Sequence, residues 1–130
     1  MDERPVVLVV EDDIEMNELE CELLDVHGLD SRAAYSGPDA LDVAAQMDVD
    51  GVLLDLMLPE INGFETCLRL RAEEGRTRRM AIVVISALDN DESRRKSFDA
   101  GADAYFVKPF DVDEVIDTIQ TLIRRRRGSS

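Results

Sequence analysis

Short apolar runs alternate along the chain with longer amphipathic stretches. Polar and turn-forming residues bound these runs, a pattern typical of strands that lie buried within a sheet. The runs predict strands at 6–10, 52–54, 81–85 and 104–107, and a weaker strand at 29–34. Such an alternation favours a fold built from repeated strand–helix units.

Amphipathic helices are predicted between and after these strands. The apolar face of the first, which we expect to point to the core, consists of Met16, Leu19, Leu23 and Val26. Gly28 is a typical C-terminal stop for this helix. The others are predicted after Gly37–Pro38, after Gly63, over 89–100 and from Val112 onward. In the helix after Gly63, the expected inner side carries Phe64, Cys67 and Leu68.

The order of elements predicts an α/β protein, with five strand–helix units forming a parallel sheet covered by helices on both faces. At 130 residues the chain is the size of one domain. We expect that domain to span 1–127, with 128–130 as a tail or the start of a linker.

Composition narrows the class of protein. Apolar residues make up 45% and charged residues 34%, which indicates a globular chain, and no apolar run approaches bilayer length. We therefore expect a cytoplasmic protein without a membrane contact. Cys21 and Cys67 fit no metal-ligand spacing and are expected to be reduced thiols.

The formal net charge of −14 argues against nucleic-acid binding by this domain. The one basic run is Arg124 to Arg127. It could contact a phosphate or an acidic partner. The favoured interpretation is a solvated helix C-terminus, where cations are stabilised by the helix dipole.

Polar side chains follow four of the predicted strands, namely Glu11, Asp12, Asp13, Asp55, Ser86 and Lys108. The carboxyl ends of parallel strands meet at one sheet edge, where such folds bind ligands. Clustered carboxylates repel unless a cation offsets them, and oxygen ligands with free water positions suit Mg²⁺. Asp55 could then attack phosphorus as a nucleophile, while Lys108 and the Ser86 hydroxyl stabilise the phosphoryl oxygens.

Each of these residues also has an ordinary structural explanation. Asp55 could be a helix cap or turn former, and acids after the first strand could simply start a helix. Ser86 and Lys108 could be common loop and surface residues. Their joint placement at strand ends favours a phosphoryl-transfer site.

The chain resembles the receiver domain of a two-component response regulator. The resemblance lies in LVVEDD at 8–13, LLDLMLPEINGFE at 53–65, VVISA at 83–87 and AGADAYFVKPF at 100–110. It implies a flavodoxin-like doubly wound (βα)5 fold with strand order 2-1-3-4-5. It covers nearly the whole chain.

The resemblance also implies a role for individual residues. Asp55 matches the phosphoacceptor, and Glu11 and Asp12 match the acidic pair that binds Mg²⁺, with Mn²⁺ as a substitute; Asp12 would bind directly and Glu11 through water. The backbone carbonyl of Met57 would be a further metal ligand. No ligand role is carried over to Asp13.

Three further positions match the family's switch and phosphate-binding elements. Ser86 matches the switch Ser/Thr, and Tyr105 the switch aromatic. Lys108 matches the lysine that contacts the phosphate. The resemblance implies a cis bond between Lys108 and Pro109.

The implied phosphodonor is a histidine kinase, a histidine phosphotransfer protein or a small phosphodonor. Phosphorylation would switch the surface of the fourth helix, fifth strand and fifth helix, which signals to a partner or output domain. Complementary charges on that surface could support a homodimer; they are Arg94, Arg95, Lys96, Asp113, Glu114 and Asp117. Two solvated charged helices explain them equally well.

Two other classes of α/β protein require residues that this chain lacks. A haloacid-dehalogenase-type phosphatase requires a second aspartate where Met57 stands. A flavodoxin-like cofactor binder requires a Ser-, Thr- or Gly-rich loop after the first strand, and this loop is acidic. A phosphorylation-independent, receiver-like interaction module remains the alternative, although it usually lacks one of the acidic, acceptor or lysine positions.

Met57 and Leu88 stand two positions beyond Asp55 and Ser86. In the family these places flank the path of the hydrolytic water and are often polar. Their bulky apolar side chains predict slow self-dephosphorylation.

Overall fold

A computed structural model describes residues 4–73 and 80–128. The strands are β1 (Val6–Val10), β2 (Asp30–Ala34), β3 (Gly51–Asp55), β4 (Ala81–Ser86) and β5 (Ala104–Val107). The helices are α1 (Ile14–Val26), α2 (Gly37–Gln46), α3 (Gly63–Glu73), α4 (Asp91–Asp99) and α5 (Val112–Gly128). Residues 129–130, part of the expected tail, lie outside the described residues.

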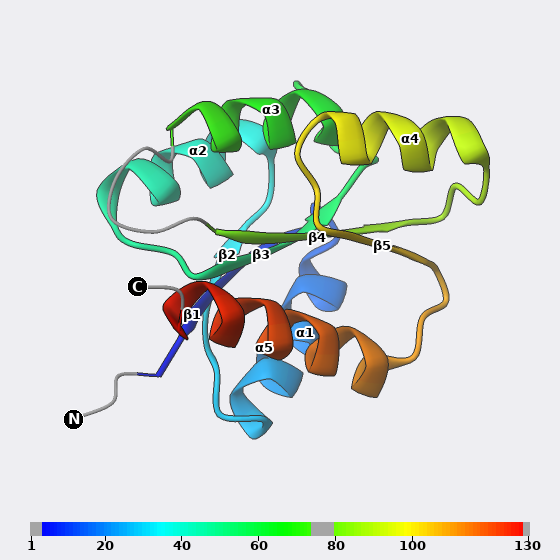
Figure 1. The fold of residues 1–130 in the computed structure, drawn as a ribbon. Coiled ribbons are helices and arrows are strands. Elements are labelled where there is room, and N and C mark those ends of the chain that lie inside the picture. Colours follow the sequence, from blue (N-terminus) through cyan, green and yellow to red (C-terminus); the bar gives the residue numbers. More distant parts are fainter. Residues whose placement is uncertain (1–3, 74–79, 129–130) are drawn as a thin grey trace.

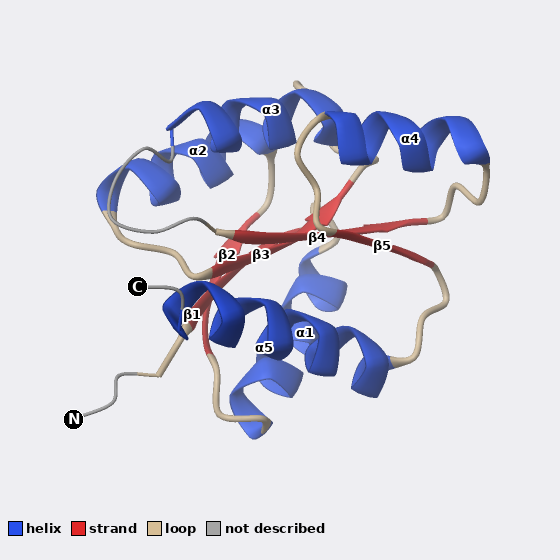
Figure 2. Cartoon of the chain, viewed as in Figure 1, coloured by secondary structure: helices blue, strands red, loops and turns tan. Residues whose placement is uncertain are grey.

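The strands form one parallel sheet in the order β2-β1-β3-β4-β5. Helices α2, α3 and α4 cover one face of the sheet, and α1 and α5 cover the other (Figures 1 and 2). The flavodoxin-like doubly wound fold implied by the sequence is therefore confirmed. Its strand order reverses between β1 and β3, and folds of this kind bind ligands at the carboxyl ends of the strands on either side of that point.

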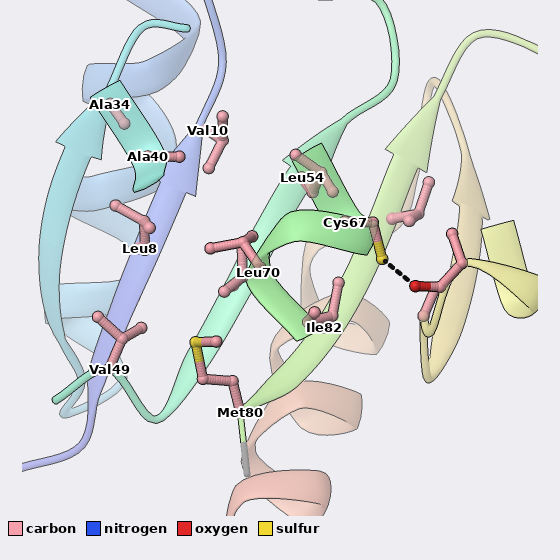
Figure 3. Close-up of a cluster of buried hydrophobic side chains, with 14 of the residues drawn as sticks. Leu8, Val10, Ala34, Ala40, Val49, Leu54, Cys67, Leu70, Met80 and Ile82 are labelled. Carbon is pink, nitrogen blue, oxygen red and sulfur yellow. Dashed lines mark hydrogen bonds between the residues drawn. The ribbon is translucent and has the colours of Figure 1, made fainter. Parts of the chain in front are cut away.

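Each face of the sheet has its own apolar core. Leu8, Leu54 and Ile82 on one face pack with Leu70 and Cys67 of α3, and the Cys67 thiol donates to the Ala100 carbonyl over 3.4 Å (Figure 3). The other core packs strand residues against α1 and α5. Because β3 and β4 are buried on both faces, their sequences are continuously apolar, which explains why these strands could be predicted.

The predicted inner face of α1 is wrong. Met16, Leu19 and Val26 are exposed, by as much as 78% for Val26. The buried residues are instead Asn17, Glu20 and Leu24, which recur at helical spacing on the side facing the sheet. The helix as a whole was predicted correctly, and Gly28 follows it with a φ of 86°, the left-handed conformation typical of a helix stop.

Leu68 of α3 likewise lies on the outer side and is 50% exposed, whereas Leu70 is fully buried. In α5, by contrast, the apolar residues at helical spacing point inward, with Val115, Ile116, Ile119 and Ile123 all buried. The two helices differ because α5 has one broad apolar stripe, whereas α3 carries apolar residues on two sides and buries only the side with Cys67 and Leu70.

The basic run at the end of α5 is not simply solvated. Arg126 donates to Asp103 Oδ1 over 2.7 Å, and Arg127 to Asp50 Oδ2 over 3.2 Å. Asp50 is only 4% exposed and also accepts from the Val6 amide over 2.8 Å. The favoured interpretation is therefore wrong for these two arginines, because carboxylates of the same chain bind them and tie α5 to the sheet.

None of the helices within residues 4–73 and 80–128 combines the length and the apolar character that crossing a membrane requires.

Candidate functional site

Three carboxylates meet where β1 and β3 end. Oxygen atoms of Glu11, Asp12 and Asp55 all lie within 4.8 Å of one another. Glu11 and Asp55 are buried, at 4% and 7% exposure, while Asp12 is exposed. The neighbouring Asp13 serves differently: its side chain accepts from the Met16 amide over 3.1 Å and caps α1.

Lys108 provides the cation that offsets this negative charge. Its ammonium donates to Glu11 Oε1 over 2.9 Å and to Asp55 Oδ2 over 3.0 Å. Burial lowers the pKa of the Lys108 ammonium, but the two carboxylates more than compensate, so the pKa is raised above its ordinary value. The Lys108–Pro109 peptide bond is cis in the structure, as the resemblance implies.

Ser86 and Tyr105 both bind the same loop residue, Leu88. The Ser86 hydroxyl, fully buried, accepts from the Leu88 amide over 3.0 Å, and the Tyr105 hydroxyl donates to the Leu88 carbonyl over 2.6 Å. Ser86 is one residue beyond Ile85, the register partner of Asp55. The sequence placed Ser86 at this edge correctly, and only the structure shows that the loop after β4 joins it to Tyr105.

The loop after β3 wraps closely around the central aspartate. The Met57 amide donates to Asp55 Oδ1 over 3.0 Å, while its side chain is 61% exposed. A Cβ atom at Gly63 would lie 2.5 Å from the Leu56 Cα and 2.8 Å from the Asp55 carbonyl oxygen. Only glycine therefore allows α3 to begin this close to the strand that presents Asp55.

The donor set suits a small divalent cation. Opposite ligands of an octahedral Mg²⁺ are separated by about 4 Å, since each bond is about 2.1 Å long. Carboxylate oxygens within 4.8 Å of one another can adopt that geometry with little movement. Glu11, Asp12 and Asp55 are accordingly the residues that could hold such an ion.

Two polar residues near this edge were not singled out from the sequence. Asn17 is fully buried on α1, and Glu20, one helical turn further on, is 6% exposed. Burial raises the pKa of the Glu20 carboxyl to about 7, and the charges of Glu11 and Asp55 add to this effect while Lys108 opposes it. The available signal was an asparagine at the fourth position of the helix, because asparagine is a poor helix former unless its side chain has a partner.

The fold and this edge define an α/β protein with an acidic site and a lysine at the carboxyl ends of its parallel strands. Residues 7–120 match the response regulator receiver domain family, and the chain belongs to that family. It is a signalling domain homologous to two-component response regulators. Receiver domains interact with histidine kinases and typically bind Mg²⁺ at an acidic pocket.

The chain is also similar in sequence to individual response regulators. The chain is 37% identical over 121 residues to the DNA-binding dual master transcriptional regulator RpaA of a Synechocystis species, covering 93% of this chain and 50% of that protein. It is 37% identical over 122 residues to the response regulator ArlR of Staphylococcus aureus, covering 92% and 53%. The chain thus spans about half the length of the curated relatives it matches.

Among solved structures, the receiver domain of the Francisella response regulator 1452 superposes with a TM-score of 0.85 at 30% identity, covering 94% of this chain and 98% of that one.

Proposed function

We propose that Asp55 accepts a phosphoryl group from the phosphohistidine of a histidine kinase or of a histidine phosphotransfer protein. The observation that carries the proposal is the joint contact of Lys108 with Glu11 and Asp55 beside a third carboxylate. This arrangement supplies a nucleophile, cation ligands and a fixed positive charge within one site.

In the proposed reaction, an Asp55 carboxylate oxygen attacks phosphorus in line with the leaving group. The new O–P bond forms as the N–P bond to the donor histidine breaks, and the electron pair leaves with the imidazole. Mg²⁺ or Mn²⁺, held by Glu11, Asp12, Asp55 and the Met57 carbonyl, would neutralise charge on the phosphoryl oxygens.

Lys108 is proposed to transfer its contact from the Asp55 carboxylate to the phosphoryl oxygens. The Ser86 hydroxyl would rotate from the Leu88 amide to the new phosphate, because Ser86 ends β4, the strand next to the one that presents Asp55. Leu88 would then move, and the Tyr105 hydroxyl that it holds would move with it. We propose that Ser86 and Tyr105 carry the signal to the surface formed by α4, β5 and α5.

That surface is proposed to contact a partner, an output domain or a second copy of the chain. Arg94 is engaged with Asp89 over 3.0 Å, and Lys96 lies over the Phe64 ring, but Arg95 is exposed. Exposed acids on α5, Asp113, Glu114 and Asp117, could pair with it across a symmetric dimer. Sedimentation of the phosphorylated and unphosphorylated forms would test dimerisation.

We further propose that residues 1–127 act as one receiver domain. A kinase partner would deliver its phosphoryl group in the cytoplasm, which is where we expect this domain to work.

The test is the intact mass of the protein after incubation with acetyl phosphate, with and without Mg²⁺. Wild type should gain one phosphoryl group only with Mg²⁺, and Asp55→Asn should gain none. Asp50→Asn is the matched control, because Asp50 is an equally buried aspartate at the opposite end of β3, and it should still be phosphorylated.

No adduct on wild type, from acetyl phosphate or from candidate kinases, would overturn the proposal. That outcome would favour the second candidate, a receiver-like module that binds partners without phosphorylation.

A further inference from the structure

Asn17 occupies an unusual place on the buried face of α1. Its amide nitrogen lies 3.1 Å from the Val9 carbonyl oxygen, 3.0 Å from that of Glu11 and 3.1 Å from that of Ala34. The side chain is fully buried. Three carbonyl oxygens around one nitrogen determine the orientation of the amide, because its oxygen would be repelled there.

These carbonyls belong to the point where the chain leaves the sheet. Val9 lies within β1, Ala34 ends β2, and Glu11 is the first residue after β1. The Glu11 amide donates to the Ala34 carbonyl over 3.1 Å, and the Glu11 carbonyl accepts from Asn17. Hydrogen bonds therefore fix both the backbone amide and the backbone carbonyl of Glu11, the residue that directly precedes Asp12.

Packing alone does not explain an asparagine at this position. Leu24, two turns along the same face, shows that the face accepts an apolar side chain. An apolar residue at 17 would remove the donor that the Glu11 carbonyl uses and would leave that carbonyl without this hydrogen bond. The amide is therefore a requirement of the β1–α1 turn and not of the core.

We propose that Asn17 is a positioning residue of the acidic cluster, holding the turn so that the Glu11 and Asp12 carboxylates stay within ligand distance of Asp55. This inference rests on the proposed cation site. The three carboxylates repel one another, so a turn without this anchor would relax outward and widen the cluster. Residues that orient metal ligands from behind commonly change metal affinity by about 10–100-fold.

The experiment measures divalent-cation binding directly, using the electron paramagnetic resonance signal of free Mn²⁺. Asn17→Ala removes the donor, and Asn17→Ser keeps one smaller donor while being less disruptive to the fold. We expect about tenfold weaker Mn²⁺ binding for Asn17→Ala and an intermediate loss for Asn17→Ser, at a temperature where circular dichroism shows both to be folded.

A second readout separates positioning from general destabilisation. Phosphorylation by acetyl phosphate should require a higher Mg²⁺ concentration in the Asn17 variants, yet approach the wild-type rate once Mg²⁺ is saturating. Asp103→Asn is the control: it weakens a polar network at the opposite sheet edge, where Arg71 and Arg126 bind Asp103. It should lower stability and leave the Mg²⁺ requirement unchanged.

Wild-type Mn²⁺ affinity in both Asn17 variants would overturn the inference, as would an equal loss in Asp103→Asn. In either case the proposed function would stand, provided wild type is phosphorylated on Asp55 with Mg²⁺. A wild-type protein that binds no Mn²⁺ and takes no phosphoryl group would overturn both.

Discussion

Asp103 and Arg126 form an ion pair of 2.7 Å at the sheet edge remote from the acidic cluster. Both side chains are 20% exposed, so water screens the pair only partly. The other Asp103 oxygen binds Arg71 of α3 over 2.8 Å. One carboxylate therefore joins α3, on one face of the sheet, to α5 on the other.

This relationship predicts that Arg126→Met destabilises the protein. The change leaves Asp103 with one guanidinium and removes a bond to the Met80 carbonyl, so the free energy of unfolding should fall by about 1–3 kcal/mol. Urea unfolding measures it. Arg124→Met, in the same run but exposed, should stay within about 0.5 kcal/mol of wild type; equal losses in both variants would contradict the assignment.

Glu20 predicts an unusual pH dependence of stability. Its pKa rises from 4.5 to about 7 on folding, so the folded state binds the proton more tightly than the unfolded state. Stability from this group is fully present below pH 4.5 and is lost as pH rises through about 7.

The free energy of unfolding of Glu20→Gln, measured with urea at pH 8 without Mg²⁺, should therefore exceed that of wild type by about 3 kcal/mol. This difference should disappear near pH 4.5. The exposed Glu22→Gln on the same helix is the control and should show no such trend. A Glu20→Gln advantage independent of pH would argue for packing instead of ionisation.

Lys108→Met is expected to separate cation binding from phosphoryl transfer. Without the ammonium, Glu11 and Asp55 repel each other more strongly, so Mn²⁺ should bind at least as tightly as to wild type. Phosphorylation by acetyl phosphate should nevertheless slow by about tenfold or more, because a fixed charge on the phosphoryl oxygens is lost. Weaker Mn²⁺ binding would contradict this prediction and would show that the main role of Lys108 is to hold the Glu11 and Asp55 carboxylates in place. Lys96→Met, over the Phe64 ring, should change neither quantity.

Met57→Asn combined with Leu88→Glu should shorten the lifetime of the phosphorylated protein. The Met57 side chain is 61% exposed beside Asp55, where an amide could orient an attacking water. Leu88 contacts Ser86 and Tyr105 through its backbone, so replacing its side chain leaves those bonds in place.

Loss of the adduct, followed by intact mass after removal of the phosphodonor, measures this lifetime. Leu68→Asn replaces an exposed leucine on α3 and should leave it unchanged. An unchanged or longer lifetime in the double variant would refute the idea.

Several elements of the fold could be predicted because their signal is local. The bounds of β1 and β5 agree with the apolar runs. β1 is largely buried between the helix layers, so its sequence is apolar throughout. β5 is a half-buried edge strand whose four residues are apolar or aromatic. Glu11, Asp12, Asp55 and Lys108 could be placed at one edge because all parallel strands end on the same side.

The amino-acid sequence by itself determined the type and order of the elements and the edge at which the reactive side chains gather, because these follow from periodicity and strand direction. Only the tertiary structure decided which side of α1 faces inward. A helix turns toward the neighbours that satisfy its buried groups, and here three backbone carbonyls bind Asn17 while Leu19 stays outside. The ion pairs of α5 were likewise decided by the tertiary structure. Asp103 is distant in sequence from Arg126, as Asp50 is from Arg127, and only the fold brings each aspartate next to its arginine.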